Sequence, residues 1–240
     1  MAFIHGKGTS VLYNGSNLSA FFNDASMSQD VETAETTAFG DSAKTYITGL
    51  KDGTMSLSGM FDGAAGAVDV VLTSTLGATA ADVATVVPSG LSSAGVSTFS
   101  AEVRETSYEI SSPVSDVVAA NAEVQATGGI DRGELLIGAS TVSSAQNTTA
   151  IDNGSSTSDG GVGYVHVTAN TRDGASTFKV QDSADNLTFA DLVAFTSVAA
   201  TTTTGERVAV TGTVDRYVRA QATPGGSSGS LTYTMAFARS

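Results

Sequence analysis

The stretch VETAETTAFGDSAKTYITGLKDGTMSLSGMFD, residues 31–62, decides how the rest of this chain is interpreted. Its first half is polar and acidic and carries one aromatic residue, Phe39, next to Gly40. In its second half Met55, Leu57 and Phe61 share one face of a strand, and the small polar residues between them share the other. The pattern predicts a long loop that leaves a β-hairpin and returns into a sheet. Loops of this length in compact domains usually bind something.

Turn signals place strands on both sides of this loop. Residues 9–13 lead into Asn14-Gly15, a strong two-residue hairpin signal, and residues 18–22 return. After the loop, residues 46–50 and 54–61 read as strands on either side of Lys51-Asp52-Gly53, and the Asp-Gly pair predicts a second tight hairpin.

One helix is expected next, with Asp62 as its N-cap and Gly77 just after its C-terminus. Apolar or small residues recur between them at three- and four-residue spacing and form one stripe: Ala64, Ala67, Val68, Val71, Leu72 and Thr75. We expect this stripe to pack on a sheet.

The remaining pattern is β. Strands are predicted at residues 83–87, 98–110 and 116–126, the last with a dry face of Val118, Ala120, Ala122 and Val124. Composition shifts near Gly128-Gly129, and further strands are predicted at 133–138, 164–168, 177–181, 192–196, 206–210, 216–221 and 230–238. The sequence therefore predicts a mainly β protein of two domains. Residues 1–130 form a β-sandwich or barrel with one packed helix, and residues 131–240 form a second all-β sandwich.

Charge narrows the classes of function. The chain has 240 residues and a net charge of −13, and residues 1–128 hold 14 Asp and Glu against 4 Lys and Arg. An acidic surface disfavours tight DNA binding, yet it suits a channel through which DNA must pass without sticking. Solubility alone is the other explanation of this charge.

The absence of cysteine and of long apolar segments excludes further classes of function. Without cysteine there is no disulfide framework and no thiolate zinc site. The first seven residues lack the order of a signal peptide, and no apolar run approaches the roughly 18 residues that span a bilayer. We expect a soluble protein, made in the cytosol and without membrane contact.

Catalytic and metal-binding patterns are weak. His166 alternates with two valines and is expected to be a surface or structural residue, and His5 is the only other histidine. Acid pairs occur at Asp30/Glu32, Glu102/Glu105 and Asp182/Asp185, with nothing to place them across a cleft. The segment 182–186 lacks the glycine and the closing glutamate of a calcium loop. We expect no enzyme activity, no metal and no cofactor.

The order of elements resembles that of the tail tube proteins of long, non-contractile-tailed bacteriophages. The matching features are the opening hairpin, the loop with Thr36-Thr-Ala-Phe39-Gly40, the strand ending Gly59-Met-Phe61-Asp62 and the single helix. Residues 131–240 are similar to the sandwich appended to some such proteins from phages of actinobacteria, with echoes at Val180-Gln181-Asp182-Ser183 and Arg216-Tyr217-Val218-Arg219.

The resemblance implies a virion protein that is assembled in the host cytoplasm as stacked hexameric rings. Each subunit would lend about four strands to a 24-stranded barrel, about 37 Å across at roughly 4.8 Å between strands, through which double-stranded DNA passes without specific binding. The implied partners are further copies of the chain, together with the tape measure, distal tail and terminator proteins. The second domain would lie on the tube exterior, where it could brace neighbouring rings or touch host surface glycans weakly many times over.

Two sets of residues are candidates for these roles. The loop 29–45 would contact neighbouring subunits, with Phe39 as its anchor unless that ring folds back on its own domain. The loop candidates are Glu32, Glu35, Thr36, Thr37, Phe39, Gly40, Asp41 and Lys44. The candidates for lining the lumen are Glu102, Glu105, Glu109, Asp116 and Glu123.

Two other classes of protein stay open on the sequence. A monomeric two-domain adhesin or carbohydrate-binding module predicts a secretion signal and exposed aromatic residues, whereas this chain has no Trp and six Tyr. An acid-pair hydrolase predicts a cleft with two facing carboxylates. Self-assembly separates the tail tube from both.

Overall fold

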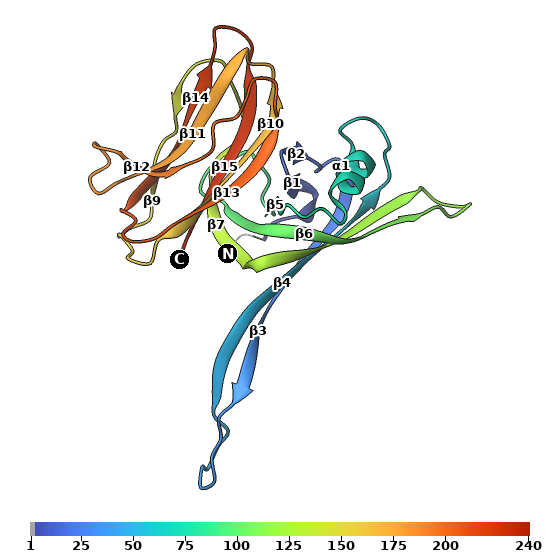
Figure 1. Ribbon diagram of the computed structural model, residues 1–240, viewed down its shortest axis with the longest axis vertical. Coiled ribbons are helices and arrows are strands. Elements are labelled where there is room, and N and C mark those ends of the chain that lie inside the picture. The colour runs from blue at the N-terminus through green and yellow to red at the C-terminus, as the bar shows by residue number, and fades with distance from the viewer. Residues whose placement is uncertain (1–2) are drawn as a thin grey trace.

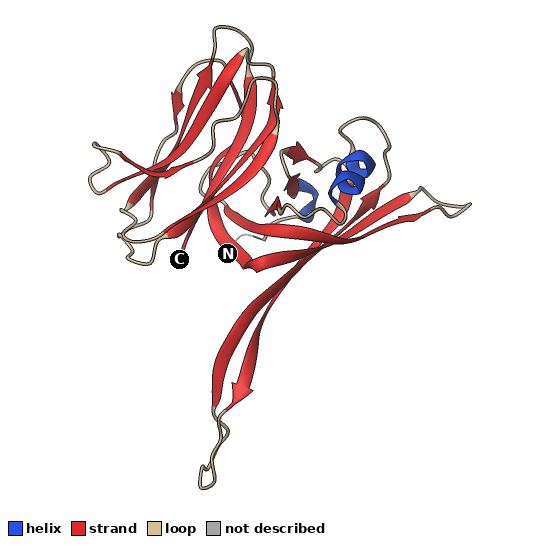
Figure 2. Cartoon of the chain, viewed as in Figure 1, coloured by secondary structure: helices blue, strands red, loops and turns tan. Residues whose placement is uncertain are grey.

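A computed structural model describes residues 3–240; Met1 and Ala2, the start of the segment scanned for a signal peptide, lie outside them. The described chain is mainly β, as predicted, with one short α-helix and two antiparallel sheets, of ten and five strands (Figures 1 and 2). Its helices are η1 (Gly6–Gly8) and α1 (Val68–Thr75). The strands are β1 (Ser10–Tyr13), β2 (Ser16–Asn17), β3 (Phe22–Glu35), β4 (Tyr46–Met60), β5 (Asp82–Val87), β6 (Ser97–Ser111), β7 (Ala119–Val142), β8 (Gln146–Asn147), β9 (Ile151–Asp152), β10 (Gly161–Asn170), β11 (Gly174–Ser183), β12 (Ala190–Ala194), β13 (Thr204–Val210), β14 (Tyr217–Gly225) and β15 (Leu231–Arg239).

The first hairpin confirms its sequence signal. Asn14 and Gly15 both have positive φ, 42° and 80°, and Tyr13 pairs with Ser16 across the turn. The predicted return at residues 18–22 is wrong, because the strand that pairs with β1 is β2, Ser16–Asn17. β2 ends at Asn17, because the Asn17 side chain turns back to accept hydrogen bonds from the backbone and the hydroxyl of Ser19.

The expected long loop is mostly strand, and the tight hairpin predicted at Asp52-Gly53 is wrong. β4 runs through both residues, and Gly53 pairs with Gln29 on β3. A Cβ on Gly53 would lie 3.0 Å from Ile130 Cγ1 and 3.3 Å from Ala126 Cβ, so this glycine permits a close approach of β7. β3 and β4 therefore form one long two-stranded arm that leaves the body, with residues 36–45 at its tip (Figure 1).

Helix α1 starts later than predicted. It begins at Val68 after Ala67, which provides no side-chain cap, whereas Asp62 lies upstream and its Oδ1 accepts a hydrogen bond from the Ala64 amide at 2.8 Å. The predicted apolar face is present, with Val68, Leu72 and Thr75 buried. Beyond the helix Gly77 has a φ of +73°, as its position after the helix predicts.

One strand, β7, runs through both halves of the chain. The glycines at 128 and 129 have positive φ, and the register with β6 jumps there, from Thr127 opposite Glu102 to Asp131 opposite Ser100. The strand therefore continues past residue 130 by way of a bulge. A division into domains near residue 130 stays a prediction.

Three apolar clusters hold the fold together. The first lies under α1 and includes Leu57, Leu72 and Val124; the second fills the sandwich between the five-stranded sheet and the strands β10, β15 and β7. A small third cluster of Val83, Val162, Tyr164 and Ala236 joins β5 to β10 and β15. Both faces of β10 are thus covered, one by the sandwich core and the other by the N-terminal half.

The covered outer face of β10 is polar. His166 has 1% of its surface exposed, and its Nε2 lies 2.9 Å from Thr85 Oγ1 on β5, so it is the structural histidine that the alternation predicts rather than a surface one. Burial lowers the pKa of His166 to about 3. The Tyr164 hydroxyl meets the Asp131 carboxylate and accepts a hydrogen bond from Arg207 Nε at 3.1 Å.

Candidate functional site

Four neighbouring strands form an open sheet with one wet face. In the order β3, β4, β7, β6, the register places Ser26, Ser56, Glu123 and Ser107 in one row across the sheet. The adjacent row, Ala25, Leu57, Ala122 and Tyr108, faces the first core cluster. The sheet therefore has one dry side and one polar side.

The wet face is acidic and small-residue rich. Ser56 Oγ donates to Glu123 Oε1 at 2.9 Å, and Gln125 Nε2 donates to the Asp52 carboxylate and to Gly53 O. Arg104 lies opposite Gln125 on β6, but its guanidinium reaches over the sheet edge to the carbonyls of Ala78 and Thr79. By register, the polar residues of this face are Asp24, Ser26, Ser28, Thr54, Ser56, Ser58, Ser107, Glu109, Asn121, Glu123 and Gln125.

Both lateral edges of this sheet are open in the part of the chain that the structure describes. β3 pairs with β4 only. On the opposite side, β5 pairs with β6 only over Phe99–Val103, so residues 104–111 of β6 pair with β7 alone. Unpaired edges present rows of free N–H and C=O groups, which are templates for another strand.

The structure separates the five lumen candidates. Glu109 and Glu123 lie on the wet face, and Asp116 is exposed in the turn between β6 and β7. Glu102 is half-buried and lines a hollow together with Glu206 and Arg207 of β13. Glu105 lies on the core face, where Thr75 Oγ1 donates to its Oε2 at 2.5 Å. Two of the five candidates thus share the open face.

The tip of the arm holds most of the loop candidates. Lys44 Nζ lies 2.9 Å from Glu35 Oε2 and lowers the pKa of that carboxyl. Thr36 bonds Thr45 through both backbone and side chain, and Thr37 Oγ1 accepts from the Thr45 amide. Every residue from Ser28 to Asp52 is exposed.

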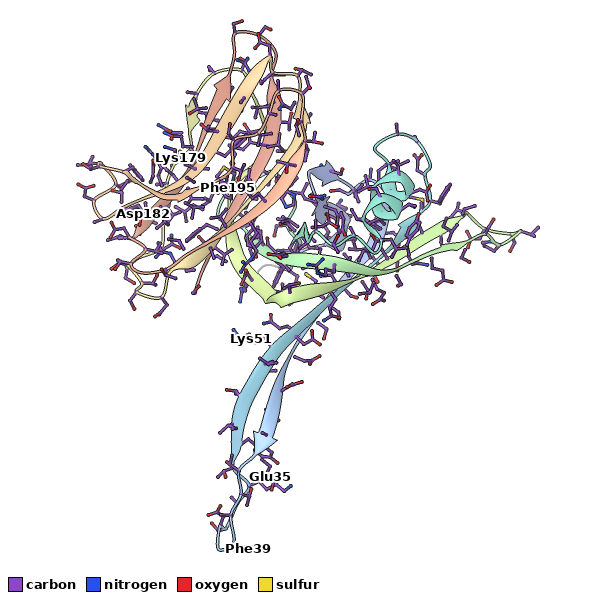
Figure 3. All side chains as sticks on the ribbon, viewed as in Figure 1. Glu35, Phe39, Lys51, Lys179, Asp182 and Phe195 are labelled. Atoms are coloured by element: carbon purple, nitrogen blue, oxygen red, sulfur yellow. The ribbon has the colours of Figure 1, made fainter. Side chains whose placement is uncertain are left out.

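Phe39 stands at the far end of the arm (Figure 3). Its side chain is fully exposed, so it does not fold back on its own domain. The tight turn around it has Gly40 at a φ of +105°, and Asp41 Oδ2 accepts from the Ala38 amide at 2.7 Å. Glu32 lies further down the arm, opposite Gly49, where an added Cβ would come 3.1 Å from the Glu32 Cβ.

The sequence interpretation missed two apolar surfaces. On the arm, Val31, Tyr46, Ile47 and Leu50 are exposed beside the acidic residues. The β6–β7 hairpin forms a second projection, drawn at the right of Figure 1, with three more exposed apolar residues near its tip: Ile110, Val114 and Val117. The sequence offered one indication of the apolar surface on the arm. Tyr46 and Ile47 are adjacent aromatic and β-branched residues, so in a strand they place apolar side chains on both faces.

The acid pair Asp182/Asp185 serves local structure. Asp182 is buried and its Oδ2 accepts from the Asp215 amide at 2.8 Å, whereas Asp185 Oδ1 accepts from the amides of Leu187 and Thr188 and holds their loop. Within residues 3–240 there is no group of three or more His, Asp or Glu side chains arranged to hold a metal ion. No helix in that range is long and apolar enough to span a membrane.

Comparisons with known proteins found distant structural similarity and no match in sequence. The sequence matches no protein-family model and no curated protein. A chain from the virion of a native gene transfer agent particle is similar at 12% identity and a TM-score of 0.45, over 54% of this chain and 98% of that chain. A chain from the tail of an empty gene transfer agent particle with C6 symmetry is 12% identical, with a TM-score of 0.39, over 46% of this chain and 80% of that one.

A third likeness spans more of the sequence. The Dit protein of SPP1, described as a paradigm of the hub adsorption apparatus in phages that infect Gram-positive hosts, is 12% identical over 95% of this chain and 97% of that chain, with a TM-score of 0.37. Because all three scores lie below 0.5, the case for function lies in the surfaces of this chain.

Proposed function

We propose that this chain is a structural protein of a phage tail and that it polymerises as stacked hexameric rings into the tail tube. The observation that carries the proposal is the open-edged sheet β3-β4-β7-β6. Its neighbouring strands are all antiparallel, so β3 and β6 run in opposite directions. A copy related by rotation alone can therefore add its β3 to β6 as another antiparallel neighbour, and repetition closes a ring.

In this proposal the wet face lines the lumen. Glu109 and Glu123 then repeat around the bore together with Asp24, and their charge keeps DNA from binding the wall. Glu105 is left out because it is buried on the core face. Six copies of four strands give the 24 strands of the expected barrel, wide enough at roughly 4.8 Å per strand for a duplex to pass.

The arm is the proposed connector between subunits. It has no core of its own, carries Val31, Tyr46, Ile47 and Leu50 exposed, and ends in the exposed ring of Phe39. A lone two-stranded hairpin of this kind is marginal in water, so burial against neighbouring copies would stabilise it. Phe39 is the proposed anchor, since interfaces concentrate energy in a few buried aromatic side chains.

The C-terminal half is proposed to lie outside the tube, as a domain from about residue 131 onward. Its core strands β10 and β15 are covered on both faces, which leaves the outer side of the five-stranded sheet for weak contacts with a host surface. Tape measure, distal tail and terminator proteins are the proposed tail partners. The virion is the proposed location, and the role is structural rather than enzymatic.

Negative-stain electron microscopy of the purified protein at rising concentration tests the proposal. Rings or tubes with a central bore a few nanometres wide are the expected result. A particle that stays monomeric at every concentration, and that also fails to join tubes when added to preformed tail tips, would count against it. A glycan array would then test the sugar-binding alternative.

The arm is tested by a matched pair of variants. Phe39→Ala removes the exposed ring at the tip of the arm, and Leu187→Ala removes an equally prominent exposed side chain from a loop of the C-terminal half. Phe39→Ala should raise the concentration needed for assembly while leaving the melting temperature of the monomer unchanged. Leu187→Ala should assemble as the unaltered chain does. Normal tubes from Phe39→Ala would defeat the assignment of the anchor.

A further inference from the structure

Glu105 is a carboxyl group buried under helix α1. It lies on the core face of β6 with 5% of its surface exposed. Val124 is its partner on β7, and Met55 and Met27 continue the same row on β4 and β3. These apolar neighbours offer a carboxylate no solvation, so the charged form is disfavoured at this position.

Thr75 can hydrogen-bond both Glu105 and the helix carbonyl only when Glu105 is neutral. Thr75, at the end of α1, has one hydroxyl proton, and its Oγ1 lies 2.5 Å from Glu105 Oε2 and 3.0 Å from Leu72 O. A carboxylate and the helix carbonyl would compete for that proton. A neutral carboxylic acid can donate its own proton to Thr75 Oγ1, which leaves the hydroxyl free to donate to Leu72 O. Glu105 Oε1 has no hydrogen-bond partner in the described chain.

Charges near Glu105 also favour its neutral form. On β1 and β5, the Tyr13 hydroxyl donates to Asp82 Oδ2 at 3.3 Å, and Asp82 is a second acid close to Glu105. On β6 and α1, the Tyr108 hydroxyl donates to Asp69 Oδ1 at 3.1 Å. Burial, with a smaller contribution from Asp82, raises the pKa of Glu105 to about 7.

The nearest cation does not compensate for this charge. Arg104 is the next residue before Glu105, but its side chain leaves the opposite face of β6, and its guanidinium reaches over the sheet edge to donate to the carbonyls of Ala78 and Thr79 rather than to Glu105. Among residues 3–240, no ion pair to Glu105 is present. Ionisation of Glu105 would therefore place an unpaired negative charge between the sheet and the helix.

We propose that Glu105 is a protonation switch that controls how firmly helix α1 is seated on the sheet. The neutral acid bridges β6 to the last turn of the helix through Thr75. When Glu105 gives its proton to solvent, the charge is relieved by moving that turn away and admitting water. The helix has eight residues and no side-chain N-cap, so it has little stability apart from its packing.

Hydrogen exchange of the α1 amides tests the switch. Protection factors, corrected for the intrinsic pH dependence of exchange, are compared at pH 6 and pH 8. Linkage between the ordinary pKa of 4.5 and a folded value of about 7 predicts that protection falls about tenfold over this interval. Glu105→Gln should remove the fall. Glu123→Gln, on the exposed face of the adjacent strand, should keep it.

A direct titration covers the case in which Glu105→Gln fails to fold. The ¹³C resonance of the Glu105 carboxyl in the unaltered protein should titrate with a midpoint near pH 7. A midpoint below pH 5, or protection factors in α1 that fall equally in Glu105→Gln, would overturn the proposal. Neither readout depends on polymerisation, so this test and that of the tail tube fail separately.

Discussion

Lowering the pH from 7 to 5 should change the stability of this protein little, because two buried groups oppose each other. His166 and Glu105 are both nearly solvent-free and lie on different interfaces of the N-terminal half. The imidazole loses its charge on folding and the carboxyl keeps its proton. Their contributions to the free energy of unfolding therefore have opposite pH dependence.

The magnitudes follow from the pKa values. For His166 the pKa falls from 6.5 to about 3, so the folded state binds fewer protons and acidification is destabilising. Between pH 7 and pH 5 this amounts to about 2 kcal/mol. For Glu105 the pKa rises from 4.5 to about 7, so the folded state binds more protons and acidification is stabilising. The same interval gives about 2 kcal/mol in the other direction.

Single substitutions should expose each contribution. Glu105→Gln leaves His166 unopposed, and its free energy of unfolding should fall by about 2 kcal/mol between pH 7 and pH 5. His166→Gln keeps a polar partner for Thr85, and its free energy of unfolding should rise by about the same amount. Carboxyls whose pKa is lowered on folding, such as Asp152, make a contribution to protein stability that is lost only below about pH 4. They therefore do not affect the comparison between pH 7 and pH 5.

Urea denaturation at both pH values, followed by far-UV circular dichroism, measures the free energy of unfolding of four proteins. The fourth protein is the double variant, whose free energy of unfolding should change as little between pH 7 and pH 5 as that of the unaltered chain. The reasoning is refuted if both single variants show the pH dependence of the unaltered chain. A common slope added to all four, with the two single variants still differing in opposite directions, would come from groups that all four contain, such as Asp82, whose pKa burial also raises.

Three further substitutions test the packing. Arg172 is 3% exposed and donates to the carbonyls of Ser143 and of residues 225, 226 and 229. Arg172→Ala should therefore lower the free energy of unfolding in urea by about 3 kcal/mol. A loss below about 1 kcal/mol would contradict the role of these hydrogen bonds in stability. Leu72→Ala should cost about 2–5 kcal/mol in the same assay, since Leu72 is fully buried on the inner face of α1. Gly59→Ala would put a Cβ 2.1 Å from Phe21 O, so the melting temperature should drop by several degrees; an unchanged value would mean that the root of the arm adapts.

The sequence predicts correctly those strands in which apolar and polar side chains alternate and one face is buried. The dry face of β7 at Ala120, Ala122 and Val124 is buried as its pattern indicates. The Asn14-Gly15 hairpin also follows from local chemistry, because a type of turn with positive φ at both residues selects that pair. These features need no knowledge of the rest of the chain.

What failed depends on contacts distant in sequence. Asp52-Gly53 looks like a turn, yet Gly53 is small because Ile130 and Ala126 approach it from β7. Alternation leaves His166 either a surface or a structural residue, and only the distant strand β5, which covers this face of β10, decides for the structural one. Glu105 is predicted to line the lumen as one acid among several on the long strands, yet it faces the core, and bulges after Ser100 and after Glu105 interrupt the alternation of β6 on either side of it.

The candidate site was found in part because its chemistry is unusual for a free-standing domain. A chain that acts alone gains little from an arm whose residues 28–52 are all exposed, since such a hairpin buries little apolar area and still loses conformational entropy. Nor does it gain from two long unpaired strand edges, which invite aggregation. Both features become favourable at once if copies pair edge to edge and arms lie on neighbours. The arm and the unpaired edge of β6, which lie on different strands, therefore support the same proposed assembly.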